Sequence, residues 1–198
     1  MTEERLTIYD GDHNCIGEAS RNDVHRNGLW HEVIHCWMIC RMGGRDWIYF
    51  QQRAFSKADF PGFYDIASTG NVDAGEKPED AAVREAFEET GVRIEKNRLS
   101  YLGMVREEIL EGNFNDREFA HVYLYQMDIP AFAPGEEVEK MIAIPAEEIE
   151  KLDRSENDSL HGTDLSGNPF AFRKEEFCRH PGEFTKLVLP KIIRQTDD

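Results

Sequence analysis

The sequence predicts a mixed α/β (α+β) fold, in which one mixed β-sheet is sandwiched between helices. Strand-like segments outnumber helical ones, one helix lies near the middle of the chain, and further helical patterns follow residue 145. This distribution is typical of a sheet covered by helices. A chain of 198 residues provides a substantial core for one domain. We therefore expect a single domain over 1–198, with an N-terminal hairpin at 1–20 and a helical C-terminal extension at about 153–198.

The first third of the chain reads as strands joined by turns. Asp10-Gly11 is a turn signal between two short apolar segments, which predicts a hairpin. The polar stretch 20–27 is expected to be a connector. A long β-prone segment, a Gly-Gly turn and a return strand follow. The predicted strands are Leu29–Cys40, Trp47–Gln52 and Phe63–Ser68.

The central helix has clear signals at both ends. Pro78 suits the first helical position, where its missing N–H would have no partner. Gly91 suits the position after the helix, which needs a left-handed conformation. Apolar residues recur at helical spacing between them, so one face should pack inward. These residues are Ala82, Val83, Ala86 and Phe87.

The second half continues the alternation of strands and turns. Strands are expected at Leu99–Ile109, Glu118–Met127 and Val138–Ile144, with a turn at 111–116 and a loop at 130–137. Pro145 opens a helix that should cover Ala146–Leu152. Two short helices, broken by prolines, are expected within 169–193.

Composition excludes several classes of partner. The net charge of −16 argues against a nucleic-acid backbone and against an anionic membrane surface as partners. The N-terminus lacks a signal-peptide layout, and no apolar run approaches the roughly 20 residues of a membrane span. The four cysteines show no metal or disulfide spacing, which is typical of thiols in a reducing compartment. We therefore expect a cytoplasmic protein.

The other face of the central helix is acidic. Glu85, Glu88 and Glu89 stand at i, i+3 and i+4, so their side chains share one helical turn. Carboxylates this close repel one another unless a cation lies among them. Hard divalent ions such as Mg²⁺ bind oxygen ligands and commonly link carboxylates to substrate phosphates. A solvated surface helix is the alternative interpretation of the three glutamates alone.

The wider pattern around this helix resembles the Nudix box of the Nudix hydrolases. Nine specified positions match at every spacing, and only Ala86 is smaller than the usual aliphatic residue. The matching residues are Gly70, Glu76, Arg84-Glu85, Glu88-Glu89 and Gly91-Val92.

The resemblance implies a metal-dependent attack of water on a diphosphate linkage. It implies that Mg²⁺ or Mn²⁺ is held by Glu85, Glu88 and Glu89 and by a backbone carbonyl near Gly70, with Arg84 orienting a carboxylate. Glu85 is the favoured general base, and Glu118, outside the box, is the alternative. The expected substrate is a small organic or nucleoside diphosphate derivative.

A second set of residues resembles a narrower branch, which contains the type I isopentenyl-diphosphate isomerases and isomerase-like Nudix hydrolases. These residues are His25, Leu29-Trp30-His31, Gln51-Gln52-Arg53-Ala54, Lys57 and Pro61-Gly62. In that branch the residues matching Arg53 and Lys57 hold the diphosphate. Arginine suits bidentate phosphate contact and lysine a point-charge contact.

The chain departs from the isomerases at the start of the box. Thr69 stands where the isomerases have their catalytic cysteine, and Asn71 replaces a metal-binding histidine. No side chain at Thr69 has the acidity of cysteine, which counts against isomerase chemistry. Because Asn71 removes one ligand, we predict no second metal site at His25 and His31.

Three functions remain as alternatives: a pyrophosphohydrolase, an isomerase-like enzyme and a catalytically silent ligand-binding domain. The intact box favours the first. The specific substrate depends on loops outside the motif, and Phe60 or Phe63 is a candidate for the pocket wall. Nudix relatives are often dimers, which leaves a homodimer open.

Overall fold

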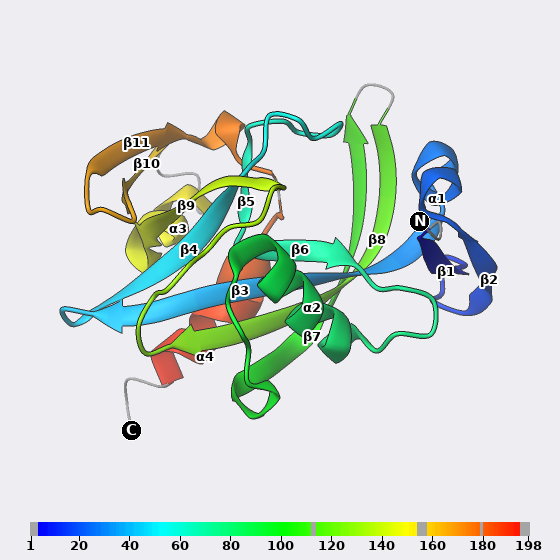
Figure 1. Ribbon diagram of the computed structural model, residues 1–198, viewed down its shortest axis with the longest axis horizontal. Coiled ribbons are helices and arrows are strands. Elements are labelled where there is room, and N and C mark those ends of the chain that lie inside the picture. Colours follow the sequence, from blue (N-terminus) through cyan, green and yellow to red (C-terminus); the bar gives the residue numbers. More distant parts are fainter. Residues whose placement is uncertain (1–3, 112–113, 154–157, 179, 195–198) are drawn as a thin grey trace.

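The structure is a computed structural model that describes residues 4–111, 114–153, 158–178 and 180–194. Within these residues eleven strands form one sheet (Figure 1). The sheet mixes parallel and antiparallel pairs, so the predicted fold class is confirmed.

Strand β3 (Trp30–Met42) is the centre of the sheet. It pairs antiparallel with β4 (Arg45–Arg53) and β6 (Ser68–Asn71) and parallel with β8 (Phe114–Met127). A strand with neighbours on both sides and helices over both faces buries most of its side chains, which explains its apolar-rich sequence. The predicted long strand is therefore confirmed.

The other strands extend the sheet from this centre. Strand β7 (Leu99–Glu111) pairs with β8, β5 (Tyr64–Ile66) and β9 (Val138–Pro145) pair with β4, and β1 (Arg5–Tyr9) pairs with β3. The main path of the sheet ends at β2 (Cys15–Ser20), which forms a hairpin with β1, and at β11 (Pro169–Arg173), which forms a hairpin with β10 (Ser159–Asp164).

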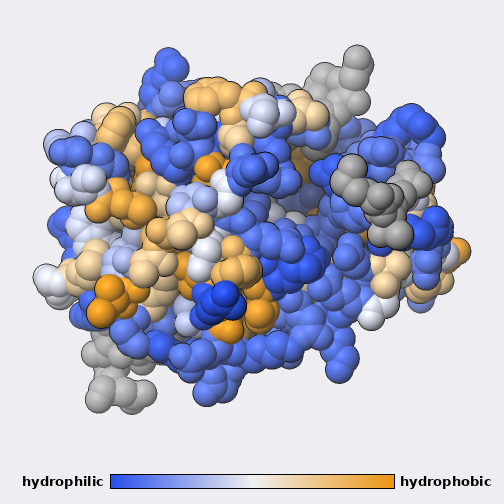
Figure 2. Space-filling model, viewed as in Figure 1, coloured by the Kyte–Doolittle hydropathy of each residue, from blue (hydrophilic) through white to orange (hydrophobic). Residues whose placement is uncertain are grey.

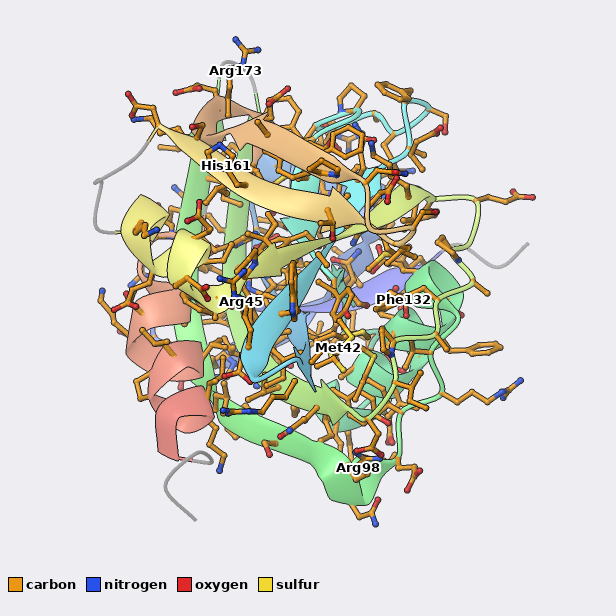
Figure 3. The ribbon with its side chains drawn as sticks, turned by 90° about the vertical axis from the view of Figure 1, so that its left-hand side faces the viewer. Met42, Arg45, Arg98, Phe132, His161 and Arg173 are labelled. Atoms are coloured by element: carbon orange, nitrogen blue, oxygen red, sulfur yellow. The ribbon has the colours of Figure 1, made fainter. Side chains whose placement is uncertain are left out.

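Helices cover both faces of the sheet. Helix α2 (Pro78–Thr90) packs on one face, and α3 (Ala146–Asp153), the π-turn η3 (Phe184–Val188) and α4 (Leu189–Arg194) pack on the other. Figure 3 shows the two groups on opposite sides of the strands, with Phe132 on the side of α2. Two short 3₁₀ turns, η1 (Lys96–Arg98) and η2 (Lys174–Glu176), complete the set. In the described part of the chain, no helix combines the length and apolar composition needed to cross a bilayer.

The polar stretch after β2 is a helix, where a connector was expected. Helix α1 (Arg21–Asn27) begins at Ser20, whose hydroxyl accepts the Asp23 N–H at 3.2 Å, and ends at Gly28 with φ of 58°. Only Val24 is buried, so the helix has no apolar periodicity. In the sequence, this helix is indicated only by the residues that cap its two ends, Ser20 and Gly28.

The C-terminal extension is only partly helical, so that expectation was wrong for two segments. Residues Ser159–Asp164 and Pro169–Arg173 form an antiparallel hairpin on β9. Gly162 allows the close pairing, because a Cβ there would lie 2.4 Å from the Ala143 carbonyl oxygen. Residues 154–157 of the expected polar segment, and residues 112–113 of the expected turn, lie outside the described part.

The inward face of α2 is narrower than predicted. Ala82 and Ala86 are buried and Val83 packs against the core, but Phe87 is exposed. The guanidinium of Arg93 lies 4.3 Å from the centre of the Phe87 ring, so a cation–π contact covers part of it. None of the four cysteines, all within the described residues, forms a disulfide.

Candidate functional site

A hollow of about 1620 Å³ opens between α2, the 53–65 loop, β7, β8 and the segment before η3. Figure 2 shows a broad hydrophilic area extending from α2 toward the upper ends of β7 and β8, where the face is hollowed. Among its described lining residues are thirteen Asp or Glu side chains and only five Lys or Arg. An anionic ligand therefore meets net negative charge there unless added cations offset it.

Gly70 brings the backbone of β6 against the carboxyl group of Glu85. A Cβ on Gly70 would lie 2.2 Å from Glu85 Cδ and 2.5 Å from its Oε1. Real side chains do not tolerate such distances, so the absence of a side chain at Gly70 is what lets the carboxyl group lie there. Helix α2 supplies Glu85 from its third turn.

Glu89 lies one turn further along the same face of α2 and is 5% exposed. Its Oε2 accepts the backbone N–H of Thr69 at 2.9 Å and the side-chain amide of Gln51 at 3.2 Å. These contacts tie the helix to β6 and β4. They also aim the carboxyl group of Glu89 at the sheet edge where Gly70 lies.

Arg84 orients the cluster from the side. Its guanidinium donates two bonds to Glu76, at 3.0 and 2.7 Å, and one to the Asn71 carbonyl at 3.0 Å. The remaining nitrogen lies 2.5 Å from Glu85 Oε1 and 3.4 Å from Glu88 Oε2. The predicted pairing of Arg84 with a neighbouring carboxylate is confirmed.

Glu85 and Glu89 are poorly stabilised as anions. Burial, with a smaller contribution from the charge of Glu88, raises the pKa of Glu85 to about 7 against the opposing effect of Arg84. Burial and the charge of Glu85 raise the pKa of Glu89 to about 8, despite the hydrogen bonds from Thr69 and Gln51. The hydrogen bonds that Arg84 donates to Glu76 raise the pKa of Arg84, which keeps it charged.

This donor set fits a hard divalent cation. Glu85 and the buried Glu89 lie one helical turn apart and repel each other as anions, and Glu88 is 58% exposed at the rim of the hollow, where it pairs with Arg84. All the available donors are oxygens, which suits Mg²⁺ or Mn²⁺. Gly70 lies directly beside this donor set, since a Cβ there would collide with the carboxyl group of Glu85.

Glu118 lies across the hollow on β8. It pairs in register with His31 on β3 and Glu107 on β7. Burial and the nearby charges of Asp116 and Glu107 raise its pKa to about 8. Glu118 lines the same hollow as Glu85, but it lies on β8 and Glu85 lies on α2.

The two cations predicted to hold a diphosphate both line the hollow, and both are engaged within the protein. Arg53 donates to the Asp59 carbonyl at 3.1 and 3.3 Å and reaches Asp65 at 3.5 Å. Lys57 forms an ion pair with Glu137. A diphosphate would have to share or replace these partners.

His25, His31 and Asp116 come together, although no metal site was predicted there. Their candidate ligand atoms lie within 4.8 Å of one another, and the two rings are 5.3 Å apart. Both Nε2 atoms are buried without a hydrogen-bond partner among the described residues. Asn71 bonds instead to Glu4 at 3.0 Å. Helix α1, which was not predicted, is the element that brings His25 to β3.

Other residues of the hollow were not identified from the sequence as a group. His180 and Asp65 line it, with His35 and Glu107, and His180 bonds to partners 73 and 115 positions away. No local spacing signals such contacts. Phe60 and Phe63, named as candidates for the wall, also line the hollow and contact each other edge to face.

Comparison with known proteins agrees with this geometry. Residues 29–162 match the model of the NUDIX domain. An uncharacterized Nudix hydrolase of Clostridium acetobutylicum is 32% identical over 98% of this chain and 98% of its own length. An isopentenyl-diphosphate Delta-isomerase of Serratia proteamaculans is 32% identical over 68% of this chain and 73% of its own.

A solved structure from Deinococcus radiodurans has the same fold. It superposes with a TM-score of 0.57 over 77% of this chain and 90% of its own length, at 24% identity.

Proposed function

The chain belongs to the Nudix hydrolase family, in the branch that resembles the type I isopentenyl-diphosphate isomerases, and from this we propose that it hydrolyses the diphosphate linkage of a small organic or nucleoside diphosphate derivative. We propose Mg²⁺ or Mn²⁺ as the cofactor. The single observation that carries the proposal is the carboxyl group of Glu85 held against Gly70, one helical turn from the buried Glu89.

In the proposed reaction, a water oxygen forms a bond to phosphorus. The bridging P–O bond breaks, and its electron pair leaves with the departing phosphate. The proton of the water goes to Glu85, the group we assign as general base, with Glu118 as the alternative. When bound, a divalent cation neutralises phosphate charge and lowers the pKa of water.

The chain's own residues supply position. Arg84 holds Glu85 through one nitrogen while Glu76 fixes the rest of its guanidinium. We assign Arg53 and Lys57 to the diphosphate, which would replace the Asp59 carbonyl and Glu137 as their partners. Arg84 and Glu76 hold Glu85 in place before substrate binds, and preorganised groups of this kind lose little free energy to reorganisation during the reaction.

Hydrolysis is better supported than isomerisation. Thr69 stands where an isomerase-like mechanism requires an acidic thiol, and its N–H is bonded to Glu89. The grouping of His25, His31 and Asp116 is the observation in favour of the alternative.

The test is turnover of a panel of organic and nucleoside diphosphates with Mg²⁺ or Mn²⁺. We expect release of phosphate or a monophosphate, and a loss of at least about 100-fold in kcat for Glu89→Gln. Glu79→Gln is the matched control, since Glu79 is exposed in the first turn of the same helix. Equal turnover by wild type and Glu89→Gln on every substrate would refute the mechanism.

A second assay separates the two reactions. Isopentenyl diphosphate in deuterated water reports isomerisation as deuterium incorporation and hydrolysis as phosphate release. We expect no deuterium in recovered diphosphate. Deuterium incorporation without phosphate release would establish the isomerase alternative.

A further inference from the structure

A buried cluster of histidines and carboxylates lies on the hollow and takes no part in the hydrolysis proposed above. His35 comes from β3, Glu107 from β7, and His180 from the segment between η2 and η3. His35 is 2% exposed and Glu107 8%. All three side chains line the hollow.

We propose that His35, Glu107 and His180 form a binding site for a divalent transition-metal ion, separate from the glutamates of α2. One ligand atom from each residue lies within 4.8 Å of the other two. His180 Nδ1 and Glu107 Oε2 are already 3.1 Å apart. Two ligands of one zinc ion lie roughly 3.4 Å apart, given bond lengths of about 2.0–2.2 Å in a tetrahedron.

Each imidazole is oriented by a carboxylate on its other nitrogen. His35 Nδ1 bonds to Glu183 Oε2 at 2.8 Å, and His180 Nε2 bonds to Asp65 Oδ1 at 3.0 Å. Histidines that bind metals almost always donate their second N–H to such a group, which fixes the tautomer and strengthens the ligand. Because His35 uses Nδ1 for its bond to Glu183, Nε2 is its candidate ligand atom.

The orienting carboxylates are themselves fixed. Trp37 Nε1 donates to Glu183 Oε1 at 2.5 Å, and Arg53 Nη1 lies 3.5 Å from Asp65 Oδ2. Both carboxylates are buried, Glu183 at 2% and Asp65 at 6% exposure. A lone structural imidazole does not need supports of this depth on both sides.

The charge balance also favours a cation. Asp65, Glu107 and Glu183 are three buried carboxylates, and among the Lys and Arg residues that the structure describes, only Arg53 pairs with one of them, Asp65. Without a metal the compensating charges are protons on His35 and His180, whose rings are 4.4 Å apart. Two imidazoliums at that distance repel each other. A dication held by neutral imidazoles provides the same positive charge without that repulsion.

The pKa values agree with this attraction for positive charge. Burial alone would lower the pKa of His180, but the hydrogen bonds that it donates to Asp65 and Glu107 raise it well above its usual value. Burial would also lower the pKa of His35, but the charge of Glu183 and the hydrogen bond to it raise that pKa.

Two nitrogens and one carboxylate select a different ion from the all-oxygen set on α2. Imidazole suits zinc, iron, nickel and cobalt, whereas carboxylates and water suit magnesium. The positions left open on the ion would face the hollow, where an anionic oxygen such as that of a phosphate could bind. His180 and Glu183 lie beyond residue 162, where the match to the family model ends.

The experiment titrates Co²⁺ into the metal-free, full-length protein in the presence of saturating Mg²⁺. Visible absorption reports nitrogen ligation, and Zn²⁺ then competes for the site. We expect His35→Gln and His180→Gln to abolish the high-affinity signal. Glu183→Gln should weaken binding about 10- to 100-fold, because it removes only an orienting contact.

The controls separate this site from other histidines. His161→Gln, at an exposed position on β10, should leave the titration unchanged (Figure 3). A signal that His25→Gln abolishes and His180→Gln leaves intact would assign the ion to the His25 cluster and overturn the proposal.

Wild-type crystals grown with a molar excess of Zn²⁺ provide a test that no folding defect can affect. Anomalous density bonded to His35, Glu107 and His180 supports the site. Anomalous maps without a peak there, with His180 still bonded to both Asp65 and Glu107, refute it and leave the cluster as a paired imidazolium network. Neither readout depends on turnover, so the hydrolase proposal stands or fails separately.

Discussion

At the scale of single residues, the close approach of Gly70 to Glu85 decides the geometry of the proposed catalytic centre. The carboxyl group lies where any side chain at position 70 would be. A methyl group there must displace Glu85, and a misplacement of about 1 Å near reacting atoms costs on the order of 100-fold in rate.

Gly70→Ala should therefore lower kcat by about 100-fold and weaken Mn²⁺ binding. Gly11→Ala is a suitable control, since its Cβ would meet nothing closer than Arg106 at 3.9 Å. Steady-state kinetics and Mn²⁺ titration measure both effects. Wild-type kinetics in Gly70→Ala would mean that Glu85 works from another position.

Glu32 makes the stability of the fold depend on pH. Burial would raise its pKa, but hydrogen bonds from His121, Tyr9 and His13, at 3.0, 2.8 and 2.9 Å, lower the pKa to about 2. An unfolded glutamate titrates near pH 4.3, so the folded state gains free energy above that pH and loses it as pH falls toward 2.

The free energy of unfolding of wild type should exceed that of Glu32→Gln by about 3 kcal/mol at pH 6. The difference should be smaller by about 1 kcal/mol at pH 3.5. This pH lies below the pKa of an unfolded glutamate, so part of the stabilisation from the low folded-state pKa of Glu32 is lost. Urea unfolding at the two pH values gives both numbers. A gap that widens on acidification would contradict the assigned hydrogen bonds.

At the scale of elements, α1 is a short helix held by its ends. Ser20 accepts the Asp23 N–H and donates to its carboxylate at 2.9 Å, while the helix buries only Val24. With so little packing, the cap contributes a large share of its stability. Helix α1 in turn carries His25 to the hollow.

Ser20→Ala should cost about 1 kcal/mol in the free energy of unfolding. Urea denaturation measures the loss, and Ser166→Ala, in an exposed turn, serves as the control. Histidine NMR should also show a changed environment for His25. An unaltered free energy of unfolding would mean that Ser20 does not stabilise α1.

Elements with a strong pattern were predictable, and weakly patterned ones were not. The box helix has Pro78 and Gly91 at its ends and a glutamate cluster at fixed spacing, so both its position and its acidic face follow from the sequence. Strand β10 has one large buried side chain, Leu160, in a polar segment. Its pairing with β9 depends on the absence of a side chain at Gly162, which no periodicity reveals.

The residues that line the hollow were also only partly predictable from sequence patterns. The glutamates of α2 are neighbours in sequence, so their proximity is a property of one helical turn. His35 and Glu183 meet across 148 positions, and only the packing of η3 on the sheet brings them together. Contacts of this kind belong to the tertiary structure and leave no local signal.

At the scale of the whole molecule, acidity and metal binding are linked. The net charge is −16 and the hollow is richer in carboxylates than in cations. A cation that binds only the folded chain stabilises it by mass action, at about 2.7 kcal/mol when its concentration is 100 times Kd.

Saturating Mg²⁺ should raise the melting temperature of wild type by roughly 5–10 °C, on the scale of about 2–4 °C per kcal/mol for a chain of this size. Scanning calorimetry with and without Mg²⁺ measures the shift. Glu89→Gln should lose most of it, and Glu79→Gln should keep it. The same rise in both variants would assign the stabilisation to general screening of surface charge.

Strand β3 has a consequence for how the chain is made. Its parallel partner β8 pairs Trp30 with Arg117, so β3 leaves the ribosome long before that neighbour has been synthesised. Until then its apolar side chains and open backbone edge resemble an aggregation-prone segment, and non-local parallel pairing forms slowly. We expect nascent chains stalled before residue 114 to recruit chaperones at this strand, and release of the complete chain to end that dependence.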